Sequence, residues 1–464
     1  VSNSTLNFYR EDSGIYGTIG KLSLSDSHFN IIGTSNKIAI TDLTINGGVS
    51  FNISDSATAL TVGSLNAVNA TVNFLLPDTI VNNDKILDVS GTADITNADV
   101  KLGISGTKKA LNKGESILLI DAATTITGEP VQKEGVAVQG LTLVYDYNLS
   151  IENNRQLRAT ISDIALNPQT KAFAQGRAAS VAGIAQIGDL VARAGVESAV
   201  KSAQEKSGAA FFSGVEGGFT RYNTGSHINL KNTSLIAGVA KTEEVINLND
   251  AYLTYGGSIE FGANWYDAYN GAIKGKGNNQ YYGLGFLSRL SLNENYYGEV
   301  SLRGGTTKGD FSSAGMGQPA SYDTNAPYWG GHMGAGYISE VGESLKLNSY
   351  AKYLYAAQNG ESAELPTEEE INFKRAASGK IVLGERLSAD AFYGGLAYEY
   401  EFYGAIDAEI SAMAVDSPSI KGGSGMAEVG YVKDLGIWKF DAGLQGYLGK
   451  RKGIGGGVKI GYRF

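Results

Sequence analysis

Alternation of apolar and polar residues runs to the last residue of the chain and recurs throughout its C-terminal half. In the final segment, Val458, Ile460, Tyr462 and Phe464 fall on one face of an extended strand, and small or charged residues fall on the other. Such a strand suits either an ordinary half-buried sheet or a membrane barrel with lipid outside and water inside. The number of these segments decides between the two folds.

Twelve alternating segments follow one another in the C-terminal half. They are 209–219, 228–241, 251–267, 280–292, 295–308, 327–340, 344–357, 377–387, 390–402, 424–434, 437–448 and 454–464. The fourth, sixth, eighth and tenth links are short (293–294, 341–343, 388–389 and 436), whereas the third, fifth, seventh and ninth are long and polar (270–279, 311–325, 358–376 and 403–423). This asymmetry is typical of outer-membrane barrels. We therefore predict a twelve-stranded antiparallel transmembrane β-barrel over residues 208–464.

The same alternation predicts which charged side chains face the barrel lumen. They are Glu260, Glu299, Arg303, Lys439, Asp441, Lys459 and Arg463. Inward charges need water or charged partners. General solvation of a wet pore is the alternative to a specific role for these residues.

An Ala-rich stretch with no proline after Pro168 predicts a helix over residues 166–207, begun by Asn167 as N-cap. The spacings Asp189/Arg193 and Glu197/Lys201 predict ion pairs one turn apart, and the glycines at 176, 183, 188 and 195 are candidate breaks. Its charges, which include Arg177, Asp189 and Arg193, exclude a lipid-facing span. Small side chains mixed with charges suit a helix inside a narrow polar tunnel; the alternative is a solvated linker helix.

Residues 1–104 carry an internal repeat. Apolar residues lead similar motifs at Leu6, Phe29, Val49, Val72 and Val100, in steps of 23, 20, 23 and 28 residues. Short strands at such intervals, separated by Asn, Asp, Gly and Ser, predict the coils of a parallel β-helix; the alternative is an irregular β-sandwich. Residues 105–165 lose the rhythm, and we expect them to form a cap that covers the last coil.

Composition excludes several classes of function. The absence of cysteine excludes disulfides and thiolate sites, and the formal net charge of -9 argues against nucleic acid as a partner. The three histidines lie in no metal-ligand spacing or catalytic triad. We therefore predict no catalytic residue, no metal ligand and no cofactor site, and a protein that is not an enzyme.

Several motifs in this chain resemble those of the type V autotransporters of Gram-negative bacteria. They are 166–172 (LNPQTKA), 213–215 (SGV), 221–227 (RYNTGSH), 395–402 (GLAYEYEF), 446–451 (GYLGKR) and 462–464 (YRF). The resemblance is strong from residue 166 onward. Before residue 166 it rests only on the style of the internal repeat. The implied architecture is mainly β: a β-helical passenger stalk (1–104), a cap-like junction (105–165), a pore helix (166–207) and a translocator barrel (208–464).

The resemblance also implies a function, a location and partners. The barrel would lie in the outer membrane and secrete its own passenger to the cell surface. Val458, Ile460, Tyr462 and Phe464 match the C-terminal signal read by the barrel assembly machinery. The expected partners are outer-membrane lipid, that machinery, periplasmic chaperones and a host-cell or bacterial surface ligand of the passenger. The alternative function is a surface adhesin for which the barrel serves mainly as membrane anchor.

Overall fold

The structure is a computed structural model, and it describes residues 1–9, 17–33, 38–54, 59–203, 209–246, 248, 250–293, 295–315, 319–342 and 344–464. The chain divides into two compact units. Unit 1 comprises Val1–Asn167 with Thr367–Glu369, and unit 2 comprises Pro168–Pro366 with Glu370–Phe464. The last residues of the predicted helix, 204–207, lie outside the described residues.

Unit 1 begins with strands that pair only in parallel with one another. These strands are β1 Thr5–Tyr9, β2 Gly17–Ile32, β3 Ile38–Ile53, β4 Leu60–Asn66, β5 Thr71–Leu76, β6 Lys85–Val89, β7 Thr92–Asp94 and β8 Asp99–Ile104. Apolar residues that point inward alternate with polar residues along them, as in β5, where Val72 and Phe74 are buried between exposed or half-buried neighbours.

A column of phenylalanine rings runs through this stack. The rings of Phe8, Phe29, Phe51 and Phe74 follow one another with centroids 5.6 Å apart. The predicted 20-residue step from Phe29 to Val49 is wrong, because Phe29 pairs with Phe51, a step of 51−29=22. The register of β2 against β3 is irregular between Ser25 and Ser27, so the repeat is displaced there by a local bulge.

After β8 most of the pairing in unit 1 is antiparallel, although β10 pairs in parallel with β7. The strands are β9 Ser116–Ala122, β10 Thr125–Thr127, β11 Glu134–Gln139, β12 Leu143–Glu152 and β13 Gln156–Leu166. β11, β12, β13 and β9 are neighbours in that order and pair antiparallel. β9 also pairs in parallel with β6, and β11 with β8, so this antiparallel sheet continues the parallel one.

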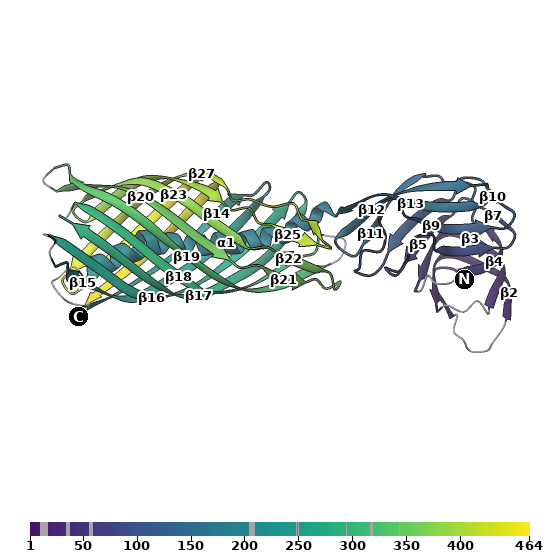
Figure 1. Ribbon diagram of the computed structural model, residues 1–464, viewed down its shortest axis with the longest axis horizontal. Helices are drawn as coiled ribbons and strands as arrows, with labels where there is room; N and C mark the ends of the chain where they lie inside the picture. Colours follow the sequence, from purple (N-terminus) through teal and green to yellow (C-terminus); the bar gives the residue numbers. More distant parts are fainter. Residues whose placement is uncertain are drawn as a thin grey trace. The chain divides into compact units, whose positions relative to one another are not determined.

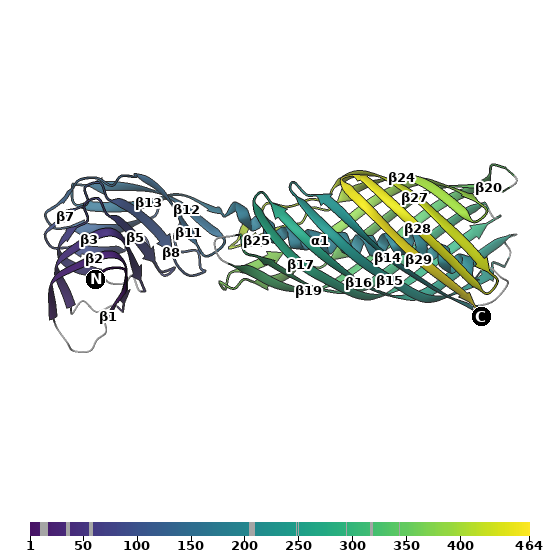
Figure 2. The same cartoon turned by 180° about the vertical axis from the view of Figure 1, so that it is seen from behind.

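Unit 2 is a barrel with a helix inside it (Figure 1). The barrel strands are β14 Ala209–Asn223, β15 His227–Glu244, β16 Ala251–Asn270, β17 Ile273–Leu292, β18 Tyr296–Ser313, β19 Ala320–Glu340, β20 Leu345–Gln358, β23 Ala376–Ala389, β24 Phe392–Tyr403, β27 Gly422–Leu435, β28 Trp438–Gly449 and β29 Arg451–Arg463. Neighbours pair antiparallel, and β29 closes the barrel against β14, seen side by side in Figure 2. The predicted twelve-stranded antiparallel barrel is confirmed.

The links between strands differ in part from the prediction. The third link is a two-residue turn, because β16 and β17 remain paired up to Asn270 and Ile273. The seventh and ninth links are long, as predicted, and carry β21 Glu361–Glu364, β22 Glu370–Phe373, β25 Ala408–Ile410 and β26 Met413–Ala414, which form a separate small sheet. We name this end of the barrel the loop end and the opposite end, where β14 begins and β29 ends, the turn end. Residues 294, 316–318 and 343 of the predicted links lie outside the described residues.

The helix consists of η1 Pro168–Thr170, α1 Lys171–Leu190, the π turn η2 Val191–Gly195 and α2 Val196–Ala203. Phe173 packs on Phe311 and Tyr322 near the loop end, and Arg463 Nε donates to the carbonyl oxygen of Ser202 at the turn end, 3.2 Å away. The helix therefore runs the length of the lumen. Among the described residues, no helix has the length and apolar character needed to cross a membrane.

The helix glycines do not break the helix, contrary to expectation. Gly176, Gly183 and Gly188 lie within α1, and a side chain on any of them would collide with the barrel wall. A methyl group at Gly188 would lie 2.9 Å from Arg303 Nη2, and one at Gly183 would overlap the amide of Asn264. These glycines allow the helix backbone to approach the wall closely.

We expect Gly183→Val to destabilise unit 2 by about 1–3 kcal/mol, because overpacking forces the helix or the wall to move. Denaturant-induced unfolding in detergent micelles measures this change. Gly446→Val is the matched control, because a methyl group there meets no atom within 4 Å. Equal stability of the two variants would contradict the steric role of Gly183.

Candidate functional site

The outer wall of the barrel is apolar. Leu284, Leu302, Leu396, Leu444 and Leu448 are between 65% and 76% exposed on it. Along the strands such residues alternate with buried ones, as in the burial patterns of β17 and β28. A contiguous apolar surface of this kind is not left in water by a soluble protein.

Aromatic pairs border this apolar surface at both ends of the barrel. At the turn end the ring pairs Tyr296–Tyr337, Phe392–Tyr431 and Trp438–Tyr462 have centroids between 4.6 and 5.0 Å apart. Nearer the loop end, Trp329 and Tyr355 pair at 5.0 Å. A closed barrel with an apolar outer band between two aromatic girdles is an outer-membrane barrel.

The structure places the predicted terminal residues on this outer wall. Val458 and Phe464 are exposed, and Ile460 and Tyr462 are half-buried. Their role as an assembly signal stays a prediction.

The structure places all seven predicted luminal residues on the inner face. Glu260, Glu299, Arg303 and Asp441 are buried. Lys459 Nζ lies 2.9 Å from Asp441 Oδ2, and Lys439 pairs with Asp434 near the turn end. Arg463 contacts the helix through Ser202. The inner charges therefore have partners, and Arg303 and Arg463 bond the helix backbone.

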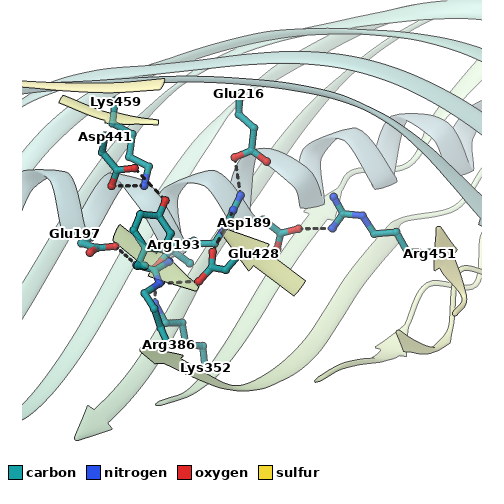
Figure 3. A network of polar contacts seen from close by, with 12 residues as sticks. Asp189, Arg193, Glu197, Glu216, Lys352, Arg386, Glu428, Asp441, Arg451 and Lys459 are labelled. Atoms are coloured by element: carbon teal, nitrogen blue, oxygen red, sulfur yellow. Dashed lines mark hydrogen bonds and ion pairs between the residues drawn. The ribbon is translucent and has the colours of Figure 1, made fainter. Parts of the chain in front are cut away.

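The helix and the wall meet in a network of charges, which we name the central network (Figure 3). The helix members and Glu216 are half-buried, and the other wall members are buried. It comprises Asp189, Arg193 and Glu197 of the helix and Glu216, Lys380, Arg386, Glu399, Glu428 and Arg451 of the wall. Arg193 Nη2 lies 2.6 Å from Glu216 Oε2, and its other terminal nitrogen lies 3.8 Å from Glu428.

The two helix carboxylates complete the network. The oxygens of Asp189 lie 2.7 Å from Lys380 Nζ and 2.8 Å from Arg451 Nη1. Glu197 pairs with Arg386, whose Nε also donates to Glu428 at 2.6 Å. Asp189 and Arg193 are thus each held by two wall charges of opposite sign and Glu197 by one, so the network positions the helix both along the lumen and about its own axis.

The ion pair predicted between Asp189 and Arg193 is not formed, whereas the Glu197–Lys201 pair is, at 2.6 Å. The π turn begins at Val191, between Asp189 and Arg193, and changes their relative direction. The wall residues take both charges instead.

Two further wall cations bind the helix backbone. Arg303 Nη2 donates to the carbonyl oxygen of Ile184 at 2.6 Å, and its Nη1 lies 3.3 Å from Glu260. Lys352 Nζ donates to the carbonyl oxygen of Ala192 at 2.6 Å and pairs with Glu299, also at 2.6 Å. Because Ala192 belongs to the π turn, Lys352 satisfies a carbonyl group in the irregular part of the helix.

At the loop end, Arg177 is buried and pairs with Glu361 of β21. All three predicted helix residues, Arg177, Asp189 and Arg193, therefore bond the barrel rather than one another.

None of the six wall residues in the central network is among the luminal residues predicted from the sequence. Their positions were available from alternation: Glu428 lies between Ala427 and Val429, which point outward on β27. Arg386 was harder to place, because it follows Glu385, and the pattern of β23 shows Glu385 exposed and Arg386 buried. Only the strand register shows which wall charges meet the helix.

The helix does not fill the lumen completely. A cavity of about 460 Å³ lies beside it, lined by Arg193, Glu197, Glu299 and Lys352 among others. Within the described part of the chain, no group of His, Cys, Asp and Glu residues could hold a metal ion. The arrangement can plug a channel.

We expect Arg193→Met to destabilise unit 2 by about 2–4 kcal/mol, because it leaves the half-buried Glu216, with a side chain 13% exposed, without its cation. Adding Glu216→Gln should recover part of this loss, which denaturant unfolding of the single and double variants measures. Lys201→Met is the matched control; its pair with Glu197 is partly exposed, so we expect a loss below about 1 kcal/mol. Additive losses in the double variant would show that the two residues do not interact.

Comparisons with known proteins give similarities of fold. No protein-family model matches the chain, and no curated protein matches it. Among solved structures, it is similar to the translocator domain of autotransporter NalP from Neisseria meningitidis, with 14% identity, a TM-score of 0.47, and coverage of 62% of this chain and 99% of that one. The transport unit of autotransporter AIDA-I from Escherichia coli matches at 12% identity and a TM-score of 0.44, covering 62% of this chain and 99% of that one. The β domain of the Bordetella autotransporter BrkA matches at 13% identity and a TM-score of 0.42, covering 55% of this chain and 99% of that one. The predicted barrel with an internal helix is present in the chain.

Proposed function

We propose that this protein is an outer-membrane autotransporter that secretes and displays the N-terminal part of its own chain. The observation that carries the proposal is the continuous path of the chain through the barrel. The helix enters the lumen at the loop end and leaves it at the turn end, just before β14 begins. Because the barrel is closed by β29 and β14, the chain before Pro168 leaves the lumen through the opening at the loop end.

The loop end is the extracellular end in this proposal. Short turns face the periplasm and longer loops face outward in outer-membrane barrels. The links that carry β21, β22, β25 and β26 are the long ones. The residues before the helix would therefore be at the cell surface.

Residues 1–104 are the proposed passenger stalk, a parallel β-helix. The parallel pairing of β1, β2, β3, β5 and β8 supports this, as does the column of phenylalanines. A second ladder supports it too: Asn30 Nδ2 donates to Asn7 Oδ1 at 2.7 Å, and Asn52 Nδ2 donates to Asn30 Oδ1 at 2.6 Å. Contacts between successive coils, rather than within a coil, are expected of a stacked repeat.

Residues 105–165 are the proposed cap, from which the stalk folds. Tyr145 and Tyr147 of β12 are buried, and their hydroxyls accept hydrogen bonds from the backbone N–H groups of Ala110 and Leu102. Burial raises the pKa of both phenols, so they remain neutral at physiological pH. β13 pairs with β12 along one edge and with β9 along the other, and β9 pairs in turn with β6. The β12–β13 pair can therefore serve as the platform on which the stalk begins to stack.

Folding outside the membrane would supply the free energy for export. A fully buried phenylalanine side chain contributes about 1.5–3 kcal/mol relative to an exposed one. Phe29, Phe51 and Phe74 are each 0% exposed. A coil that stacks on the cap would therefore resist return into the lumen by several times the thermal energy, and each further coil would add to this.

The proposed roles of the sites follow from this reading. Glu260, Glu299, Arg303, Lys439, Asp441, Lys459 and Arg463 line the translocation path and hold the helix after export. Val458, Ile460, Tyr462 and Phe464 present the signal for the barrel assembly machinery, and periplasmic chaperones would keep the chain unfolded before insertion. The ligand of the passenger would be a molecule of a host or bacterial surface.

Protease treatment of intact cells that carry the full-length protein tests the proposal. We expect the residues before the helix to be lost and a membrane fragment that starts near Pro168 to survive, as detected by antibodies against both ends. The closed barrel around the helix is the reason for the protection. Complete resistance of the chain, or its complete digestion, would contradict the proposal.

Deleting residues 105–165 tests the cap. We expect surface exposure of the N-terminal residues to fall at least about tenfold, an order-of-magnitude expectation for loss of the folding platform, while the barrel still assembles. The control is deletion of residues 1–59, which ends before β4 and leaves the cap intact. If the N-terminal residues of the two deletion variants were equally exposed at the cell surface, the cap would have no role in export.

A further inference from the structure

Three cations stand side by side on the outer wall of the barrel near the loop end. Lys452 of β29 is directly opposite Arg221 of β14. On the other side of β14, Lys231 of β15 is directly opposite Phe219. All three cations are exposed. The cluster therefore spans three neighbouring strands across the closing seam of the barrel.

The cluster has positive charge that the protein does not neutralise. None of the three cations has a carboxylate within ion-pair distance in the described part of the chain: Arg221 Nε donates to Asn229 Oδ1 at 2.8 Å, and Lys231 Nζ lies 5.7 Å from the ring centre of Phe219. Asp267 lines the same surface, but its Oδ1 pairs with Lys274 at 3.2 Å. Like charges directly opposite each other on two strands destabilise a sheet. A bound anion would therefore reduce the repulsion between Arg221 and Lys452.

These cations surround a groove of about 480 Å³ that is also lined by aromatic rings. Phe219 and Trp265 are 60% and 52% exposed in it. Toward the turn end, the next outward residues on the same strands are apolar or small, and Ile454 is 66% exposed. The groove therefore combines positive charge with exposed aromatic rings, and Ile454 extends its apolar surface toward the turn end.

We propose that this groove binds the phosphate-bearing head group of a lipid of the outer leaflet. The charge pattern matches such a lipid: Arg221, Lys231 and Lys452 would bond phosphate oxygens, for which guanidinium and ammonium groups are suited. The acyl chains would lie on Phe219, Trp265 and Ile454, at the height where aromatic residues meet the membrane interface. The inference rests on the proposed orientation, in which the loop end faces outward.

Lipid binding to the purified full-length protein in detergent tests the inference. The probes are a bis-phosphorylated lipid A, the same glycolipid with its phosphates removed, and inorganic phosphate as a competitor; native mass spectrometry counts the bound lipid. We expect Arg221→Gln/Lys231→Gln/Lys452→Gln to weaken binding of the phosphorylated lipid by on the order of 10–100-fold, because each cation near a lipid phosphate contributes to attraction. Binding of the dephosphorylated lipid should be weak and unchanged by the substitutions.

The matched control is Lys241→Gln/Lys276→Gln/Lys308→Gln, which removes three cations elsewhere on the outer wall; Lys276 and Lys308 are exposed, and Lys241 is half-buried and paired with Glu243. We expect this control to bind like the unmodified protein. Equal weakening in this control, unchanged binding in the groove variant, or full displacement of lipid by inorganic phosphate would each overturn the inference. Heat-modifiable gel mobility and membrane fractionation check that every variant forms a barrel. A failure of the outer-membrane proposal would appear there in all proteins, whereas a failure of the lipid inference would leave the barrel inserted.

Discussion

The buried pairing between the charges of the helix and those of the barrel wall is the interaction on which the lumen depends. A charge enclosed by protein is costly unless a partner of opposite sign lies against it. The wall contributes Glu216 and Glu428 around Arg193, and Lys380 and Arg451 around Asp189. The charged side chains of the helix thus neutralise those of the wall, and the reverse also holds.

Such pairs add less to stability than their number suggests, because each ion must first be removed from water. Their stronger effect is on position. A helix of mostly small side chains could slide or rotate in a tunnel without much change in apolar contact, but displacing Arg193 or Asp189 would leave several buried charges unpaired. The close approach of the helix glycines to the wall and the hydrogen bonds from Arg303 and Lys352 to the helix backbone also fix the position of the helix.

Period-two alternation was sufficient to predict the strand number and the inner face of the barrel, because a strand that separates lipid from a polar lumen cannot change its period. Glu260 and Asp441 could therefore be assigned to the lumen from their neighbours alone. The partners of Asp189 and Arg193 could not, since they depend on which strands the helix contacts and on a π turn that leaves no clear mark in the sequence. The polar residues of the third link show no apolar face and so predict a loop, whereas β16 and β17 continue to pair there.

In unit 1 the repeat was visible but its register was not. Phe29 has two apolar residues downstream, Val49 and Phe51, and both fit the motif. Phe29 pairs with Phe51 because a local irregularity in β2 displaces the ladder and because the two phenylalanine rings then pack edge to face. A tertiary contact between residues far apart in sequence decided what the local pattern left open.

The division of the central network between two separate segments of the chain restricts how this protein can be rebuilt or can evolve. A helix taken from another barrel would bring its own pattern of charges, and Lys380, Arg386 and Arg451 would face the wrong neighbours. The charges of residues 168–203 and those of the inner face of the strands therefore have to match one another. Exchange of modules between proteins of this architecture should succeed where the junction precedes the helix and fail where it falls between the helix and β14.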